Sequence, residues 1–173
     1  MQKKKTLIFF LTILFLGTLA ITSCNKDDEL EGVDKQLYDM AKSTDGFTWF
    51  ENSSDLLDKS VGSGHSFPFL RTRYNATAAA KLDSLGRIIS DATFPEGSLI
   101  VKELYGDANS LDRTAILYKQ SNNSSADANG WVWGYINSDE SVAVSATDKG
   151  NQCIGCHTQD GSIDYMLMNK FFP

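Results

Sequence analysis

Two cysteines and one histidine stand close together near the C-terminal end of this 173-residue chain, in the stretch CIGCH, residues 153–157. Two residues separate the thiols, and His157 follows Cys156 directly. The chain has only three cysteines and two histidines, so shuffling it would give this arrangement in about one of a thousand trials. The motif therefore requires a fold that brings two sulfur atoms and one imidazole to a single place.

Covalent haem binding is the interpretation that uses all three side chains. In C-x-x-C-H each thiol adds to a vinyl group of haem, and the histidine ligates the iron. A closed zinc site needs four ligands, and His65 is the only other histidine. A thioredoxin-like dithiol expects a buried strand before the motif, whereas residues 145–152 are polar and break helices. We expect one covalent haem c on Cys153 and Cys156, with His157 as the iron ligand; zinc and a dithiol are the alternatives.

The beginning of the chain has the pattern of an export signal. Three lysines precede an apolar run from Leu7 to about Ile21, and the residues before Cys24 resemble the lipobox of bacterial lipoproteins. A membrane-spanning anchor is the alternative, because the run approaches the roughly 18 residues that suggest one. We therefore expect lipid attachment at Cys24. The expected organisation is a signal over residues 1–23, an acidic tether over 24–32 and one haem domain over 33–173.

The net charge of the chain limits the classes of partner that it can bind. Without Lys3, Lys4 and Lys5 the chain has 13 basic and 22 acidic residues, a formal charge of −9. Such a surface argues against nucleic acid, because phosphate binding needs clustered Lys and Arg. Membrane affinity would come from the lipid and not from a basic patch. We expect export and attachment to the outer membrane, with the periplasmic side and the cell surface both open.

Hydrophobic periodicity predicts the α+β class, a mainly antiparallel sheet with flanking helices. Helical spacing predicts an amphipathic helix over Val33–Ser43. Alternating or β-branched stretches predict strands over residues 69–74, 98–105, 113–119, 131–136 and 141–145. Further helices are expected from a cap at Asn75 to about Leu85, over Asn151–His157, and from a cap at Ser162 to the C-terminus.

Four stretches, in chain order, resemble segments of the cytochrome P-460 domain family, which includes the beta-sheet cytochromes c′. They are RYNATAAAKL, FPEGSLIVKELYG, GWVWGYI and CIGCHTQDGSIDYML. The resemblance implies a mainly antiparallel β fold, a single c-type haem and frequent dimers. It also implies a five-coordinate iron whose distal face is open to nitric oxide or hydroxylamine. A small nitrogen ligand, a redox partner and a second copy of the chain are thus the expected partners.

The family also suggests how to separate two activities. Its enzymatic branch carries a lysine cross-linked to the haem, a few residues before the segment that matches FPEG. That register falls near Ile89 and Ser90, and neither is lysine. The nearest lysine is Lys81, and we interpret Lys102 as structural. The resemblance therefore favours the c′-like branch over hydroxylamine oxidation.

In the c′-like branch phenylalanines crowd the distal face, and Phe67 and Phe94 are our candidates for that cap. For His65 the alternatives are a distal haem ligand and an ordinary loop residue. Because its loop is glycine-rich, we expect it to be exposed or hydrogen-bonded locally. Met166 and Met168 are interpreted as ordinary helix packing. The preferred function is a lipid-anchored monohaem cytochrome that transfers electrons or binds small nitrogen oxides. The alternatives are a hydroxylamine or nitric oxide oxidoreductase with a cross-linked lysine, and a haem-free dithiol lipoprotein.

Overall fold

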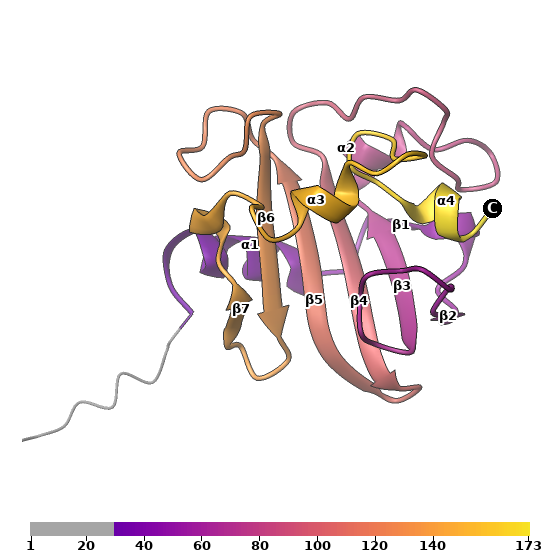
Figure 1. The fold of residues 1–173 in the computed structure, drawn as a ribbon, viewed down its shortest axis with the longest axis horizontal. Helices are drawn as coiled ribbons and strands as arrows, with labels where there is room; N and C mark the ends of the chain where they lie inside the picture. Colours follow the sequence, from indigo (N-terminus) through magenta and orange to yellow (C-terminus); the bar gives the residue numbers. More distant parts are fainter. Residues whose placement is uncertain (1–29) are drawn as a thin grey trace, which may run out of the picture.

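One antiparallel sheet organises the protein (Figure 1). The computed structural model describes residues 30–173, so the predicted signal and the lipid site at Cys24 lie outside the described residues. The strand order is β1-β3-β4-β5-β6-β7, and β2 pairs with β3 beside β1. No helix within residues 30–173 is long and apolar enough to span a bilayer.

The strands are β1 (Thr48–Trp49), β2 (Leu57–Asp58), β3 (Phe69–Tyr74), β4 (Leu99–Asp107), β5 (Ser110–Lys119), β6 (Trp131–Asn137) and β7 (Val142–Val144). The helices are α1 (Gly32–Lys42), α2 (Ala76–Ala79), α3 (Ile154–His157) and α4 (Met168–Phe171), with 3-10 turns η1 (Phe50–Asn52) and η2 (Ala146–Asp148). Every strand pairing is antiparallel. The predicted α+β class and its five strands are confirmed.

The two faces of the sheet are covered by different elements, because successive side chains of a strand point to opposite faces. Figure 1 shows α1 behind the sheet and α3 and α4 in front of it. On the α1 side, Leu37 packs so closely on β6 that a Cβ added at Gly134 would lie 2.8 Å from its Cδ1. This core contains Leu30, Leu37, Ala41, Leu99, Val101, Ile116, Val132, Ile136 and Ala146.

The front face carries a second and larger core. Its buried members include Phe50, Leu70, Tyr74, Ile88, Phe94, Ile100, Leu104, Leu117, Trp131, Trp133 and Met166. Part of this face is not filled by side chains, and the C-terminal segment with α3 and α4 lies across it. The front face is therefore where a pocket forms.

The predicted helix after Asn75 is real but much shorter than expected. Asn75 caps it, since its Oδ1 accepts a hydrogen bond from the Ala78 amide at 2.9 Å, but α2 ends at Ala79. The chain then forms a small hairpin in which Leu82 pairs with Ile88. These backbone groups bond across the hairpin and not along a helix, so the predicted end near Leu85 is wrong.

The predicted C-terminal helix is also wrong over its first half. Residues 163–166 form a tight turn, with Ile163 and Met166 paired and with positive φ at Asp164 (44°) and Tyr165 (71°). Helix α4 begins only at Met168. Ser162 does not cap it; its hydroxyl donates to the His157 carbonyl at 2.6 Å. The apolar spacing of this segment reflects burial of a turn.

On the α1 side a buried carboxylate joins three neighbours. Glu103 accepts hydrogen bonds from Arg71 Nε at 2.5 Å and from the Tyr105 hydroxyl at 2.6 Å, and it pairs with Arg73. Arg73 and Glu103 are 2% and 6% exposed. Burial lowers the pKa of Arg73 to about 10. This cluster holds β3 against β4 and takes both arginines away from the front face.

Removing the charge of Glu103 should therefore destabilise the fold strongly. In Glu103→Gln the buried Arg73 loses its counter-charge, and we expect a loss of about 3 kcal/mol in the free energy of unfolding. The matched control is Glu51→Gln, which breaks the half-exposed pair with Arg87 and should cost less than about 1 kcal/mol. Urea unfolding followed by circular dichroism measures both, and equal losses would contradict the assignment.

Candidate functional site

Strand register builds the floor of a pocket on the front face. Two rows of directly paired residues cross the sheet: Thr72, Lys102, Ala115 and Tyr135 in one, and Ile100, Leu117 and Trp133 in the other. All of them line one mainly apolar pocket. The small side chain of Ala115 at the centre of its row leaves room above the sheet.

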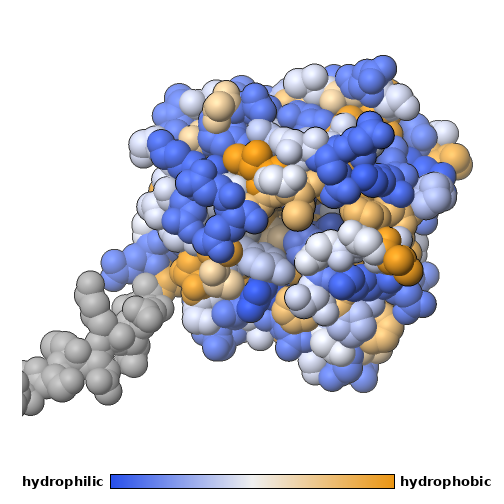
Figure 2. Space-filling model, viewed as in Figure 1, coloured by the Kyte–Doolittle hydropathy of each residue, from blue (hydrophilic) through white to orange (hydrophobic). Residues whose placement is uncertain are grey.

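An outer hollow adjoins this pocket on its solvent side. The two spaces share His65, Cys153 and His157 as lining residues. Figure 2 shows this face hollowed near its middle, with apolar surface between hydrophilic side chains. Together the two spaces form a site with an apolar interior and an open mouth.

The cysteines of the CIGCH motif stand at the boundary between the pocket and its mouth. Cys153 is partly buried and lines both spaces, whereas Cys156 is exposed and lines the outer hollow. Both are free thiols. Burial, followed by the charges of Asp148 and Cys156, raises the pKa of Cys153. This shift makes Cys153 a poor candidate for the nucleophile of a redox pair.

The motif is held in place by a close contact between backbone and indole. Gly150 has φ of +70°, and a Cβ added there would lie 2.6 Å from the Trp133 ring. Its carbonyl accepts the amides of Cys153 at 2.8 Å and Ile154 at 2.9 Å, which starts the turn that becomes α3. Glycine is required here for both conformation and space.

His157 presents one ring nitrogen to the pocket. Its Nδ1 donates a hydrogen bond to the Tyr165 carbonyl at 2.6 Å, so Nε2 keeps its lone pair. The Trp133 indole packs against the imidazole, with ring centres 5.2 Å apart and planes at 83°. Burial lowers the pKa of His157, although the bond to Tyr165 opposes this shift. The ring is thus neutral near pH 7, oriented and able to bind a metal through Nε2.

The turn that provides the Tyr165 carbonyl is itself anchored. Asp164 accepts hydrogen bonds from Trp131 Nε1 and from the Phe94 amide, both at 2.9 Å. Asn129 donates to the Tyr165 hydroxyl at 2.6 Å. These bonds offset the cost of two left-handed residues in succession. A rigid turn therefore sets the tautomer and the direction of His157.

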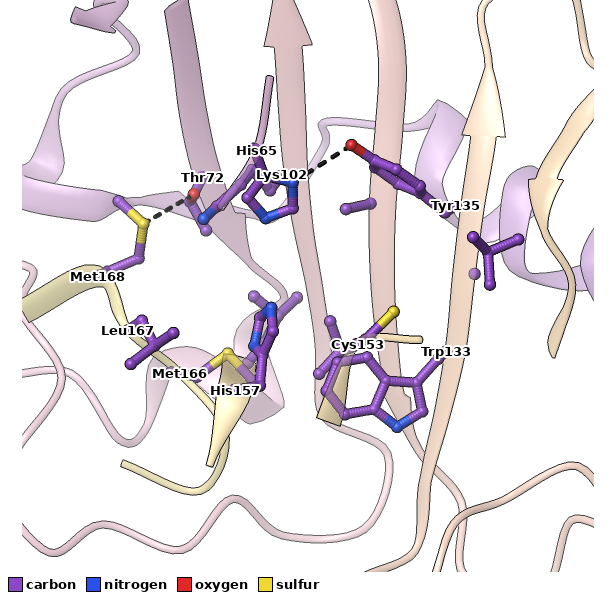
Figure 3. Close-up of a pocket in the computed structure, with 15 residues that line it drawn as sticks. His65, Thr72, Lys102, Trp133, Tyr135, Cys153, His157, Met166, Leu167 and Met168 are labelled. Carbon is purple, nitrogen blue, oxygen red and sulfur yellow. Dashed lines mark hydrogen bonds between the residues drawn. The ribbon is translucent and has the colours of Figure 1, made fainter. Parts of the chain in front are cut away.

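His65 lies on the opposite wall of the pocket (Figure 3). Its Nδ1 is 3.3 Å from the Tyr135 hydroxyl. Burial, assisted by the charge of Lys102, lowers the pKa of His65 to about 3, so the ring is neutral at physiological pH. The expectation of an exposed or locally bonded histidine is wrong, because its partner lies 70 positions further along the chain.

The two phenylalanine candidates lie in different places. Phe67 lines the outer hollow, and the Arg113 guanidinium lies 5.4 Å from its ring centre. Phe94 is 1% exposed and packs against Tyr74 and Trp131 in the core, without lining the pocket. Its ring is used in core packing, so the structure does not place Phe94 as a cap over this site.

Lys102, which we interpreted as structural from the sequence, belongs to the site. Its side chain lines the pocket. Burial lowers its pKa to about 8. The missed signal was strand alternation, which puts Lys102 on the same apolar face as Ile100 and Leu104. Lys81, the lysine considered first, does not line the pocket.

Met166 and Met168 also line the pocket, where we had expected ordinary helix packing. The Thr72 hydroxyl donates to the Met168 sulfur at 3.3 Å, which fixes that side chain against the floor. Their apolar surfaces, with that of Leu167, form the wall beside His157. The C-terminal segment thus closes the pocket from above.

These residues fit a haem better than a bare metal ion. A porphyrin needs an apolar slot, a free imidazole nitrogen and, for covalent attachment, two thiols at the rim. The pocket, His157 Nε2, Cys153 and Cys156 supply each of these. Within the described part of the chain, no three side chains of the His, Cys, Asp or Glu type are grouped to hold a metal ion alone, which leaves zinc without its further ligands.

A free imidazole nitrogen inside an apolar pocket, with two thiols at its rim, is the chemistry that haem-binding cytochromes use. The family model of Cytochrome P460 matches residues 72–168, more than half of the chain. The chain belongs to the Cytochrome P460 family. A comparison with curated protein sequences gives no match.

Filling the contact between Gly150 and Trp133 should displace the motif. We expect Gly150→Ala to lower the free energy of unfolding by roughly 2–4 kcal/mol, because positive φ and overpacking both oppose a side chain. Gly97→Ala is the control, since Gly97 has φ of +82° but no atom within 4 Å of an added Cβ; it should cost about 1 kcal/mol. Equal losses in urea unfolding would show that the indole contact is unimportant.

Proposed function

We propose that the protein is a monohaem c-type cytochrome whose haem is bound covalently through Cys153 and Cys156, with His157 as the proximal ligand. The observation that supports this most is the convergence of two free thiols and one free imidazole nitrogen on an apolar pocket. The haem would supply a redox-active iron that can take up or release one electron.

Attachment would consume the two free thiols. Each S–H adds across the C=C bond of one vinyl group, so a C–S and a C–H bond form and no oxidant is needed. Cys153 borders the inner pocket and Cys156 the outer hollow. Both must be reduced at that moment, and neither is in a disulfide.

The chain's own groups would tune the bound iron. The Tyr165 carbonyl accepts the Nδ1 proton of His157, which raises the basicity of the ligating nitrogen. The apolar lining from Ile100, Leu117 and Leu167 keeps water away and lowers the local dielectric constant. Trp133 packs on the imidazole and restrains its rotation.

The proposed location is outside the cytoplasm, at the outer membrane. The signal over residues 1–23 would direct export, and a lipid on Cys24 would hold the domain at the outer membrane. The proposed partners are a redox protein and a small nitrogen ligand such as nitric oxide or hydroxylamine. The proposal is compatible with a homodimer and with attachment to either face of the outer membrane.

Expression with haem-attachment machinery tests the proposal. We expect a coloured protein with an ordinary ferrous c-type absorption spectrum and a haem-sized mass increment on the peptide that contains Cys153 and Cys156. Cys153→Ala/Cys156→Ala should lose all covalent haem, whereas Cys24→Ala should lose the lipid and keep the haem. A wild-type protein with two titratable thiols and no covalent haem would refute the assignment.

One observation favours the oxidoreductase alternative. Lys102 carries a primary amine into the pocket, and its pKa of about 8 leaves part of it uncharged near neutral pH. A neutral amine is a nucleophile. A cross-link would replace one N–H bond of Lys102 and one C–H bond at the porphyrin edge by an N–C bond, and a two-electron oxidant such as a peroxide would take up the two electrons and two protons. The register near Ile89 and Ser90 lacked a lysine, but the folded chain supplies one from β4.

A cross-link between Lys102 and the haem can be detected by spectroscopy and by peptide mass. The oxidoreductase alternative predicts a strongly red-shifted ferrous band and a Lys102 peptide that carries haem mass, both lost in Lys102→Met. The control is Lys81→Met, which removes the lysine outside the pocket and should change neither. Recovery of an unmodified Lys102 peptide from the haem-loaded protein would exclude this alternative.

A further inference from the structure

Two histidines face one another across the pocket. His157 projects from α3, and His65 projects from the 61–68 loop, the segment between β2 and β3. Their ring centres are 6.3 Å apart, and their planes are inclined at 82°. These are the only histidines of the chain, and the fold brings them together from positions 92 residues apart in sequence.

Each imidazole ring makes its hydrogen bond through Nδ1 and leaves Nε2 without a bond. His157 is bonded through Nδ1 to the Tyr165 carbonyl, and His65 through Nδ1 to the Tyr135 hydroxyl. Figure 3 shows the two remaining nitrogens, the Nε2 atoms, directed toward one another across the pocket. The arrangement presents two nitrogen lone pairs to one point whenever His65 Nδ1 donates its proton to Tyr135.

The separation suits a single metal ion between the rings. A first-row metal lies about 2 Å from an imidazole nitrogen, and that nitrogen lies about 1.2 Å from the ring centre, so two opposed imidazoles have centres about 6.4 Å apart. The observed 6.3 Å agrees with this value. Aromatic pairs also occur at about 4.5–7 Å, so the opposed Nε2 atoms, and not the distance alone, decide the interpretation.

The 61–68 loop lies close to the two C-terminal helices. A Cβ added at Gly64 would lie 3.9 Å from the Cys156 sulfur, and one added at Gly62 would lie 3.7 Å from the Phe171 ring. The loop therefore rests on α3 and α4, the segments that also carry His157 and close the pocket. Its two ends are tied to the sheet by β2 and β3.

We propose that His65 is the second axial ligand of the haem iron, opposite His157. The inference rests on the proposed function, because it requires a haem in the pocket. The iron is then six-coordinate at rest, in contrast to the open distal face that the family resemblance implied. Electron transfer becomes the resting activity, and a small ligand binds only after it displaces His65. Tyr135 acts as a positioning residue that restrains the His65 ring through its contact with Nδ1.

Spectroscopy of the haem-loaded wild type gives the first test. We expect a low-spin ferric signal in electron paramagnetic resonance and slow binding of carbon monoxide to the ferrous form. A high-spin ferric wild type with covalent haem overturns this inference and leaves the proposed function intact. A wild type without covalent haem overturns the proposed function, and this inference with it.

Variants give the second test. His65→Ala should convert the ferric signal to high spin and raise the apparent affinity for carbon monoxide at least about tenfold, because the competing ligand is gone. Val61→Ala is the control, since Val61 lies in the same loop and is 98% exposed; it should keep the low-spin signal. A His65→Ala protein that stays low-spin would assign the sixth position to another residue of the pocket, Lys102 foremost, and overturn the inference.

Discussion

The register of four antiparallel strands is the constraint on which the rest of this protein depends. Because side chains alternate across a sheet, fixing one pairing fixes which residues share a face. In this sheet the register places Thr72, Lys102, Ala115 and Tyr135 in one row, although they come from four separate strands. The same register sends Arg73 and Glu103 to the opposite face, beneath α1. One strand register therefore determines both the residues that line the pocket and the residues of the core on the opposite face.

The pocket departs from an ordinary core in its polar groups. His65, Lys102 and His157 all line it, and burial shifts the pKa of each toward the neutral form. Neutral nitrogen atoms with free lone pairs are suited to a metal or to covalent chemistry and are costly as mere packing. A fold that retains three of them on one apolar face is organised around a ligand. The family membership of the chain, that of haem-binding cytochromes, agrees with this chemistry.

Sequence reasoning succeeded where the signal was local. Strand alternation located β3 to its residue bounds and the other four predicted strands within a few residues, and the cap at Asn75 was correct. The two-residue strands β1 and β2 were not predicted. It failed where distant contacts replaced local ones. Residues 163–166 have helical apolar spacing but form a turn, because Trp131 and the Phe94 amide bond Asp164. Phe94 was placed at the site by type, whereas the fold uses its ring in the core.

The sequence by itself determined the chemistry at one end of the site. Two thiols and an imidazole within five residues must lie close together in any fold, because the chain between them is too short to separate them. Only the tertiary structure decided what faces them. His65 and Lys102 lie 92 and 55 positions before His157, and no local pattern shows which strand row or loop packs against the motif. Their roles follow from register, burial and hydrogen bonds that exist only once the sheet has formed.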